Sequence, residues 1–347
     1  MPFTSYIKTE VDDPMELFNA CREGRVDDVK RLLARDDDVN KADKYGRTPL
    51  FMACQLGYAE VARLLLARKE IQINQTDQDG TTPLLMTCQG GHVEVARLLL
   101  ARKEIQINQA QNSGVTPLFM TCQLGHVDVV ELLLARKEIQ INQAMKNGAT
   151  PLFIACQEGH VDVVELLLAR KEIQINQAMK SGTTPLYIAC MTGHIDVVRL
   201  LLAQKEIQIN QATNRGATPL FITCATGHMD VVKLLLTRKE IKINKADKDG
   251  MTPLLITCVG GRADIVQLLL ARKDIQINQA TKDGFTPLYA TCRKGHVDVV
   301  QLLLAQKDID VNKTTNEGAT SLDIAIKMKH SQIAILLRQK GGKNNRR

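Results

Sequence analysis

The sequence predicts an all-α repeat solenoid in which helix–turn–helix units are stacked and joined by β-hairpin-like loops. The first observation is a glycine that recurs every 34 residues from Gly46 to Gly318. The second is that each interval holds two short apolar stretches with helical start and stop signals. A fixed period of this size is typical of proteins in which each unit buries its apolar face against its neighbours. The 347-residue chain is therefore expected to form one elongated array rather than two or three globular domains.

The N-terminal part of the chain reads as a lead-in followed by a terminal cap. Asp13 before Pro14 predicts a helix start. Two short helices, 15–23 and 26–34, carry many charges, as an outer face without a neighbour requires. The segments we expect are a flexible lead-in at 1–13, an array at 14–340 (an N-terminal cap repeat at 14–45, eight full repeats at 46–317 and a C-terminal cap repeat at 318–340) and a basic tail at 341–347.

The repeat that begins at Gly80 shows the regular unit. Thr82 predicts a helix N-cap, and Pro83 suits the first helical position. Gly90–Gly91 predicts the end of this first helix, because glycine tolerates the left-handed conformation. A second apolar helix is predicted over Val93–Arg102. Its first turn carries an acidic residue and its last turn carries a basic residue, and both complement the helix dipole.

The segment after the second helix connects one unit to the next. Ile alternates with polar residues over Glu104–Asn108, which indicates extended backbone, and Asn112–Gly114 is a turn signal. The last unit departs from this pattern: Ser321 replaces the proline and Asp323 replaces an apolar residue. We therefore interpret it as the second cap, and we expect Lys343–Arg347 to be disordered.

Four motifs recur in fixed order: Thr-Pro-Leu, Gly-His, an apolar helix with Leu-Leu-Leu, and Ile-Asn or Val-Asn. Their order over residues 14–340 resembles the ankyrin repeat, whose usual period is about 33 residues. The residue after Thr-Pro-Leu, often His in that family, is here always Phe, Tyr or Leu. The resemblance implies a surface for binding other proteins. It also implies that the loop tips and the inner face of each first helix line the concave side of the array.

The cysteines and histidines each occupy a single repeat position. Neighbouring layers lie about 8–10 Å apart, whereas a disulfide needs Cα atoms within about 7 Å. We therefore expect buried, reduced thiols and a structural role for the histidines at the turn, with neither type binding a metal. The positions are Cys21, Cys54, Cys88, Cys122, Cys156, Cys190, Cys224, Cys258 and Cys292, and His92, His126, His160, His194, His228, His296 and His330.

Asparagines and Arg-Lys pairs also recur once per repeat. Asn74 and Asn312 match the glycosylation sequon, but loop hydrogen bonding explains the whole series of nine asparagines. Each Arg-Lys pair, such as Arg102-Lys103, lies at a helix C-terminus and precedes an acid, which favours a structural role over contact with an acidic partner. Aromatic residues that could stack on bases do not alternate with these pairs.

Charge and motif content limit the functional classes. Residues 318–347 hold seven Lys or Arg and one acid, so most of the net charge of +7 belongs to the C-terminal end. We expect no nucleic-acid partner, no membrane span and a monomer. We also expect no enzymatic activity, because phosphate-binding, nucleophile and zinc motifs are missing, and no cofactor. No secretory signal is visible, so the expected location is the cytoplasm, with the nucleus as an alternative.

Comparison of the repeats with one another suggests where a partner could bind. Variation concentrates beside the repeat glycine and in the two residues before the next glycine. Drift at exposed positions is an equal alternative, although apolar residues among them, such as Val115, Val259 and Phe285, favour a contact surface. The candidate protein-binding residues are Tyr45, Arg47, Gln55, Asp79, Thr81, Gln89, Ser113, Val115, Gln123, Asn147, Ala149, Gln157, Glu158, Thr183, Met191, Arg215, Ala217, Met251, Phe285, Arg293 and Lys294.

The sequence therefore predicts a non-catalytic scaffold that binds partner proteins through the concave face of the array. The alternative is an adaptor whose terminal segments recruit a second component, such as a ubiquitin ligase or a membrane surface. The basic tail 340–347 is the feature that favours the alternative.

Overall fold

The computed structural model describes residues 15–35 and 37–345. Over these residues the regular structure consists of twenty α-helices of seven to nine residues each, and no β-strand is present. Helices this short are marginal in isolation, so their stability comes from packing against one another. The predicted lead-in 1–13 and the Asp13-Pro14 helix start lie outside the described residues.

The chain is divided into two compact units, Met1–Ile173 and Gln174–Arg347, and each is described by itself. The helices of the first unit are α1 (Glu16–Glu23), α2 (Val26–Ala34), α3 (Pro49–Leu56), α4 (Ala59–Leu66), α5 (Pro83–Gly90), α6 (Val93–Leu100), α7 (Pro117–Leu124), α8 (Val127–Leu134), α9 (Pro151–Glu158) and α10 (Val161–Leu168). Those of the second unit are α11 (Pro185–Thr192), α12 (Ile195–Leu202), α13 (Pro219–Thr226), α14 (Met229–Leu236), α15 (Pro253–Val259), α16 (Ala263–Leu270), α17 (Pro287–Lys294), α18 (Val297–Leu304), α19 (Ser321–Lys327) and α20 (Ser331–Gln339).

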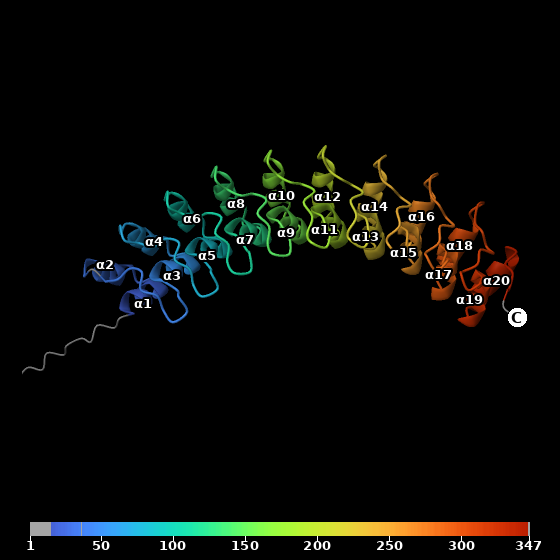
Figure 1. The fold of residues 1–347 in the computed structure, drawn as a ribbon, viewed down its shortest axis with the longest axis horizontal. Helices are drawn as coiled ribbons and strands as arrows, with labels where there is room; N and C mark the ends of the chain where they lie inside the picture. The colour runs from blue at the N-terminus through green and yellow to red at the C-terminus, as the bar shows by residue number, and fades with distance from the viewer. Residues whose placement is uncertain (1–14, 36, 346–347) are drawn as a thin grey trace, which may run out of the picture. The chain divides into compact units, whose positions relative to one another are not determined.

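Within each unit the helices form antiparallel pairs that stack in chain order (Figure 1). The odd-numbered members, which we call the first helices, pack in one row: α3 lies against α1 and α5, and in the second unit α17 lies against α15 and α19. The even-numbered members, the second helices, pack in a parallel row. The predicted stacking of helix–turn–helix units is therefore confirmed within each unit.

The start and end of each first helix follow the predicted signals. In α5 the Thr82 hydroxyl accepts a hydrogen bond from the backbone N–H of Leu85 at 3.1 Å, and Pro83 is the first helical residue. Gly91 ends the helix with a φ of 67°. An L-residue with a side chain rarely adopts that conformation, which explains why glycine recurs there.

The second helices end earlier than predicted. The prediction extended the helix in the Gly80 repeat to Arg102, but α6 ends at Leu100. Arg102 leaves the helix because its guanidinium donates to the carbonyl oxygen of Leu66 in the preceding repeat and pairs with Glu104. These contacts lie on the loop side of the helix end, so they compete with a further helical turn.

The core of each unit lies between the two rows of helices. Leucines of the Thr-Pro-Leu motif, such as Leu50, Leu84 and Leu220, are at most 1% exposed. Full burial of such a side chain stabilises the fold by roughly 2 kcal/mol. Because the same position is filled in successive repeats, the apolar core is continuous along each row.

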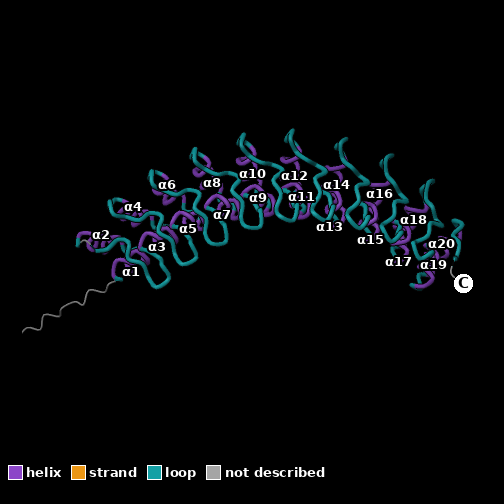
Figure 2. The backbone as a smooth tube through the Cα atoms, viewed as in Figure 1, coloured by secondary structure: helices purple, strands orange, loops and turns teal. Residues whose placement is uncertain are grey.

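The connecting loops form tight turns rather than strands (Figure 2). In the loop before α7, the N–H of Gln111 donates to the carbonyl of Val115 at 3.0 Å, and Gly114 donates to Gln111 at 2.8 Å. The hairpin-like shape is therefore confirmed, while Ile107 and Asn108 lie in a turn and Ile105 belongs to no strand. Both isoleucines are buried, so their alternation reflects packing rather than strand geometry.

The C-terminal segment is bonded to the last repeat, which corrects part of the prediction of disorder. The N–H of Lys343 donates to the side chain of Asn312 at 2.7 Å, and the hydroxyl of Thr320 donates to the carbonyl of Lys343 at 2.8 Å. The N–H of Asn345 donates to Asp323 at 3.2 Å. Residues 343–345 therefore cover the end of the second unit, where the next repeat would otherwise supply these partners.

Candidate protein-binding surface

The histidines link successive repeats. Nε2 of His92, at the start of α6, lies 3.1 Å from the carbonyl oxygen of Gln55 at the end of α3. His160 makes the same contact with Gln123 at 3.0 Å. The contact is repeated for His126 with Gln89, His228 with Met191 and His296 with Val259. The predicted structural role is confirmed for these five histidines.

The asparagine series forms a second set of links between repeats. Asn108 donates through Nδ2 to the carbonyl of Glu138 at 2.8 Å and accepts through Oδ1 from the N–H of Gln140 at 2.9 Å. One side chain thus satisfies a donor and an acceptor of the next loop. The structural interpretation is therefore confirmed for Asn108 and for the six other asparagines at which the same pair of bonds recurs. These are Asn40, Asn74, Asn176, Asn210, Asn244 and Asn278.

The arginines of the Arg-Lys pairs bond to the second helix of the preceding repeat. Arg238 donates to the carbonyl of Leu202 at 3.1 Å and pairs with Glu240 at 3.0 Å. Arg272 repeats this arrangement with Leu236 and Asp274. A guanidinium satisfies the last carbonyls of a helix well. These arginines are thus part of the fold, as predicted.

The cysteines are buried and free of disulfides, as predicted. Burial raises the pKa of the thiols, for instance to about 12 at Cys54 and Cys190. A buried thiol with a raised pKa is a poor nucleophile and a poor metal ligand. Among residues 15–35 and 37–345, no three His, Cys, Asp or Glu side chains are grouped so that they could hold a metal ion.

The side chains that remain exposed around the first helices form the candidate surface. We define the first-helix surface as the residues on either side of each repeat glycine and the two residues before the position that ends each first helix. The predicted contacts that are exposed are Tyr45, Asp79, Gln89, Ser113, Asn147, Glu158, Met191, Arg215, Arg293 and Lys294. Those that are half-buried are Arg47, Gln55, Gln123, Gln157, Thr183, Met251 and Phe285. Those that are buried are Thr81, Val115, Ala149 and Ala217.

The four buried residues all follow a repeat glycine, and in these repeats that residue points toward the protein. Val115 is 7% exposed and Ala149 is 4% exposed. The carbonyl of each accepts a hydrogen bond across the loop, Val115 from Gln111 and Ala149 from Met145. The prediction of an exposed apolar contact at Val115 is therefore wrong. Arg47 and Phe285 hold the same repeat position and are half-buried, so the degree of burial differs from repeat to repeat.

Two groups of predicted residues come together, one in each unit. In the first unit, the guanidinium of Arg47 lies 5.0 Å from the ring centroid of Tyr45 and pairs with Asp43 at 2.6 Å. The Asp43 pKa is lowered: burial opposes the shift, and hydrogen bonds from the Arg47 side chain and the backbone of Arg47 and Tyr45 outweigh it. In the second unit, Arg293 lies 6.0 Å from the ring of Phe285.

The predicted set omits six of the eight large exposed apolar residues among those that the structure describes, and two of the six end first helices of the first unit. Leu56 and Leu124 end α3 and α7 and are 41% and 43% exposed. Their counterparts in other repeats include glycine, glutamate, threonine and lysine. The signal that could have found them is a leucine at a position where the fold accepts polar residues.

Comparison with known proteins agrees with the geometry. A family model described as ankyrin repeats in three copies matches residues 8–77, 69–145, 137–213, 207–281 and 271–347. An ankyrin repeat-containing protein of Saccharomyces cerevisiae is 43% identical over 53 residues, which is 15% of this chain. The match spans about a tenth of the yeast protein. In the part of the chain that the structure describes, no helix has the length and apolar character of a membrane span.

Proposed function

The chain belongs to the ankyrin-repeat family, and on that premise we propose that it is a non-catalytic scaffold that binds partner proteins through the first-helix surface. Ankyrin repeats generally serve as protein–protein interaction modules. The observation that carries the proposal is the distribution of exposed apolar side chains. Of the eight large ones among the described residues, five belong to the first-helix surface. They are Tyr45, Leu56, Leu124, Met191 and Met328.

The second helices have a different surface. Their exposed side chains are mainly charged or polar, and some of them pair along the helix, as in Arg63 with Glu60 at 3.2 Å and Lys233 with Asp230 at 3.3 Å. Such pairs are solvated and contribute little energy. Exposed apolar groups, in contrast, gain free energy when a partner removes them from water. The first-helix surface is therefore the better binding face.

A capture experiment with matched variants tests the proposal. The tagged full-length chain is used to capture proteins from a cell lysate, and bound proteins are quantified by mass spectrometry. The test variant is Leu56→Glu with Leu124→Glu, and the control is Arg63→Ala with Arg97→Ala on the second helices of two repeats. Each variant lowers the net charge by two. We expect the test variant to lose partners that the control retains, provided both melt as the parent does. Equal capture by both would contradict the proposal.

The adaptor alternative is tested in the same assay. The test variant removes the basic character of the tail by substituting Ala for Lys340, Lys343, Arg346 and Arg347. It leaves the backbone bonds of Lys343 to Asn312 and Thr320 intact. Loss of all partners in this variant would favour recruitment through the tail. Retained capture is the result that we expect.

A further inference from the structure

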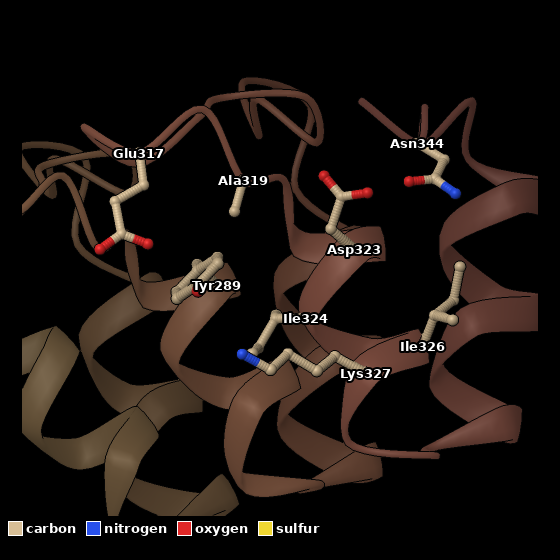
Figure 3. A pocket seen from close by; sticks show the side chains of 8 residues that line it. All are labelled: Tyr289, Glu317, Ala319, Asp323, Ile324, Ile326, Lys327 and Asn344. Carbon is tan, nitrogen blue, oxygen red and sulfur yellow. The ribbon is translucent and has the colours of Figure 1, made fainter. Parts of the chain in front are cut away.

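A hollow in the second unit lies beside Tyr289, between α17, α19 and the C-terminal segment (Figure 3). Its volume is about 300 Å³. Tyr289, Ala319 and Ile324 provide apolar walls, and Glu317 and Lys327 lie at its edge. A cavity at the small end of the range for ligand sites suits one apolar side chain rather than a large ligand.

The hollow exists because the last repeat departs from the pattern. Asp323 occupies the position that holds Tyr289 one repeat earlier. Its carboxylate accepts from the N–H of Thr320 at 2.8 Å, and its own N–H donates to the Thr320 hydroxyl oxygen at 3.2 Å, so the two residues together cap the start of α19. A carboxylate that is shorter than a tyrosine and turned back to its own helix start leaves the space beside Tyr289 open. The helix cap and the hollow thus have the same cause.

An aromatic and cationic cluster adjoins the hollow. The rings of Phe285 and Tyr289 are stacked, with centroids 5.1 Å apart and an angle of 8° between the planes. The guanidinium of Arg293 lies over the Phe285 ring. Phe285 is half-buried and Arg293 is exposed. The wall of the hollow is therefore continuous with a positively charged surface.

The charge around the hollow is unusual for a first helix. Arg293 and Lys294 end α17, and Lys327 ends α19. All three are exposed, and none forms an ion pair among the described residues. The corresponding pairs at the ends of the other seven Thr-Pro-Leu helices contain no cation. Cations complement a helix C-terminus, but those seven helices form without them, so the fold does not require them. Among the residues that line the hollow, the acids are Glu317 and Asp323, and Asp323 is engaged in the cap.

We propose that the Tyr289 hollow binds an acidic linear segment of a partner protein, with one apolar side chain of the segment in the hollow. Aspartates or glutamates on either side of that side chain then contact Arg293, Lys294 and Lys327. Complementary charge increases the rate of encounter and selects the partner, while the apolar side chain supplies burial. The inference rests on the proposed protein-binding function and specifies the chemistry of one partner.

Synthetic peptides test this directly. The probes are fluorescein-labelled nonapeptides with a central Leu, flanked on both sides by Asp and Glu, by Ser and Gly, or by Lys. A fourth probe keeps the acidic flanks and has a central Ser. Binding to the full-length chain is measured by fluorescence anisotropy at low and at physiological salt. We expect the acidic peptide with Leu to bind most tightly, and its affinity to fall as salt rises.

Three variants locate the site. Arg293→Glu with Lys327→Glu reverses two exposed charges and is expected to weaken binding of the acidic Leu peptide by about tenfold. Ala319→Met places extra apolar atoms in the hollow without changing charge and is expected to prevent entry of the Leu side chain. The matched control is Lys205→Glu with Lys239→Glu, which reverses two exposed loop lysines of the same unit. It should bind the acidic Leu peptide as the parent does. Thermal melts confirm that each variant is folded.

The outcomes are distinct from those of the capture experiment. Three outcomes would each overturn the proposal that the Tyr289 hollow binds an acidic segment. The acidic and neutral peptides could bind equally, the acidic Leu peptide could fail to bind, or both site variants could bind it as the parent does. The proposed scaffold function would still stand if the Leu56→Glu, Leu124→Glu variant loses captured partners. Failure of both experiments would reject both proposals.

Discussion

Nε2 of His92 lies 3.1 Å from the carbonyl oxygen of Gln55, and its ring lies over Gly57 of the same preceding repeat. Gly57 ends α3 with a φ of 75°. A Cβ at that position would lie 2.5 Å from Nδ1 of His92. The glycine and the histidine therefore depend on each other: the glycine ends the helix, and its missing side chain makes room for the link between repeats.

This relationship predicts the outcome of a double-mutant cycle. Gly57→Ala should destabilise the array by more than the approximately 1 kcal/mol of the left-handed backbone, because the new methyl group also displaces His92. His92→Ala should cost about 1 kcal/mol through the lost hydrogen bond. In the double variant the clash is absent, so its loss should be smaller than the sum of the two single losses. Urea unfolding followed by circular dichroism measures all three, and strict additivity would contradict the steric link.

The asparagine series predicts a large effect from a side chain at the protein surface. Asn108→Ala leaves the N–H of Gln140 and the carbonyl of Glu138 without their side-chain partner. Because each lost hydrogen bond costs roughly 0.5–1.5 kcal/mol and two are lost, the unfolding midpoint should fall clearly. Gln106→Ala is the matched control, because Gln106 uses only its backbone N–H in the equivalent bond. Similar midpoints for the two variants would show that the asparagine links contribute little.

The cysteines predict a loss of stability at high pH. In the folded state, burial raises the pKa of Cys54, Cys190 and Cys224 to about 12 from an ordinary 9.0. The unfolded chain ionises first, so the stabilising contribution is complete below pH 9 and is lost as the pH rises toward the folded-state value. The melting temperature should therefore fall between these pH values. Cys190→Ala should reduce the slope of that fall. An unchanged slope would argue against ionisation of the buried thiols as its cause.

The same burial predicts low thiol reactivity. Ellman's reagent at pH 8 should react with none of the nine cysteines in the folded chain and with all nine in urea, because the thiolate is the reactive species. Rapid labelling of the folded chain would mean that the rows of helices open readily. The reaction rate thus measures local opening of the core.

The Asp43–Arg47 pair predicts that the stability of the fold also depends on pH in the acidic range. The Asp43 pKa is lowered in the folded state, so its contribution is present above the ordinary value of 3.8 and disappears as the pH falls through the folded-state pKa. Asp43→Asn should therefore be less stable than the parent at pH 7, and the difference should vanish at low pH. A constant difference in melting temperature from pH 7 to pH 3 would exclude the charge of Asp43 as its source.

Local signals in the sequence predicted the helices, while the contacts between repeats required the structure. Thr82 and Pro83 are adjacent in the sequence and mark a helix start, so such signals together with the period were enough to place the helix pairs. The partners of Asn108 and His92, however, lie 30 or more residues away, and no local pattern identifies them. Val115 shows the same limit: its variation suggested a surface position, but the loop turns it inward. The hollow beside Tyr289 was not predicted, because it depends on where the carboxylate of Asp323 points.

Hydrogen–deuterium exchange on a complex with the most abundant captured protein tests the central claim most directly. If the first-helix surface is the binding face, peptides containing the ends of the first helices, such as 52–58 and 120–126, should exchange more slowly in the complex. Peptides from the second helices, such as 60–66 and 128–134, should be unchanged. Protection confined to the second helices or to the segment 340–347 would contradict the account.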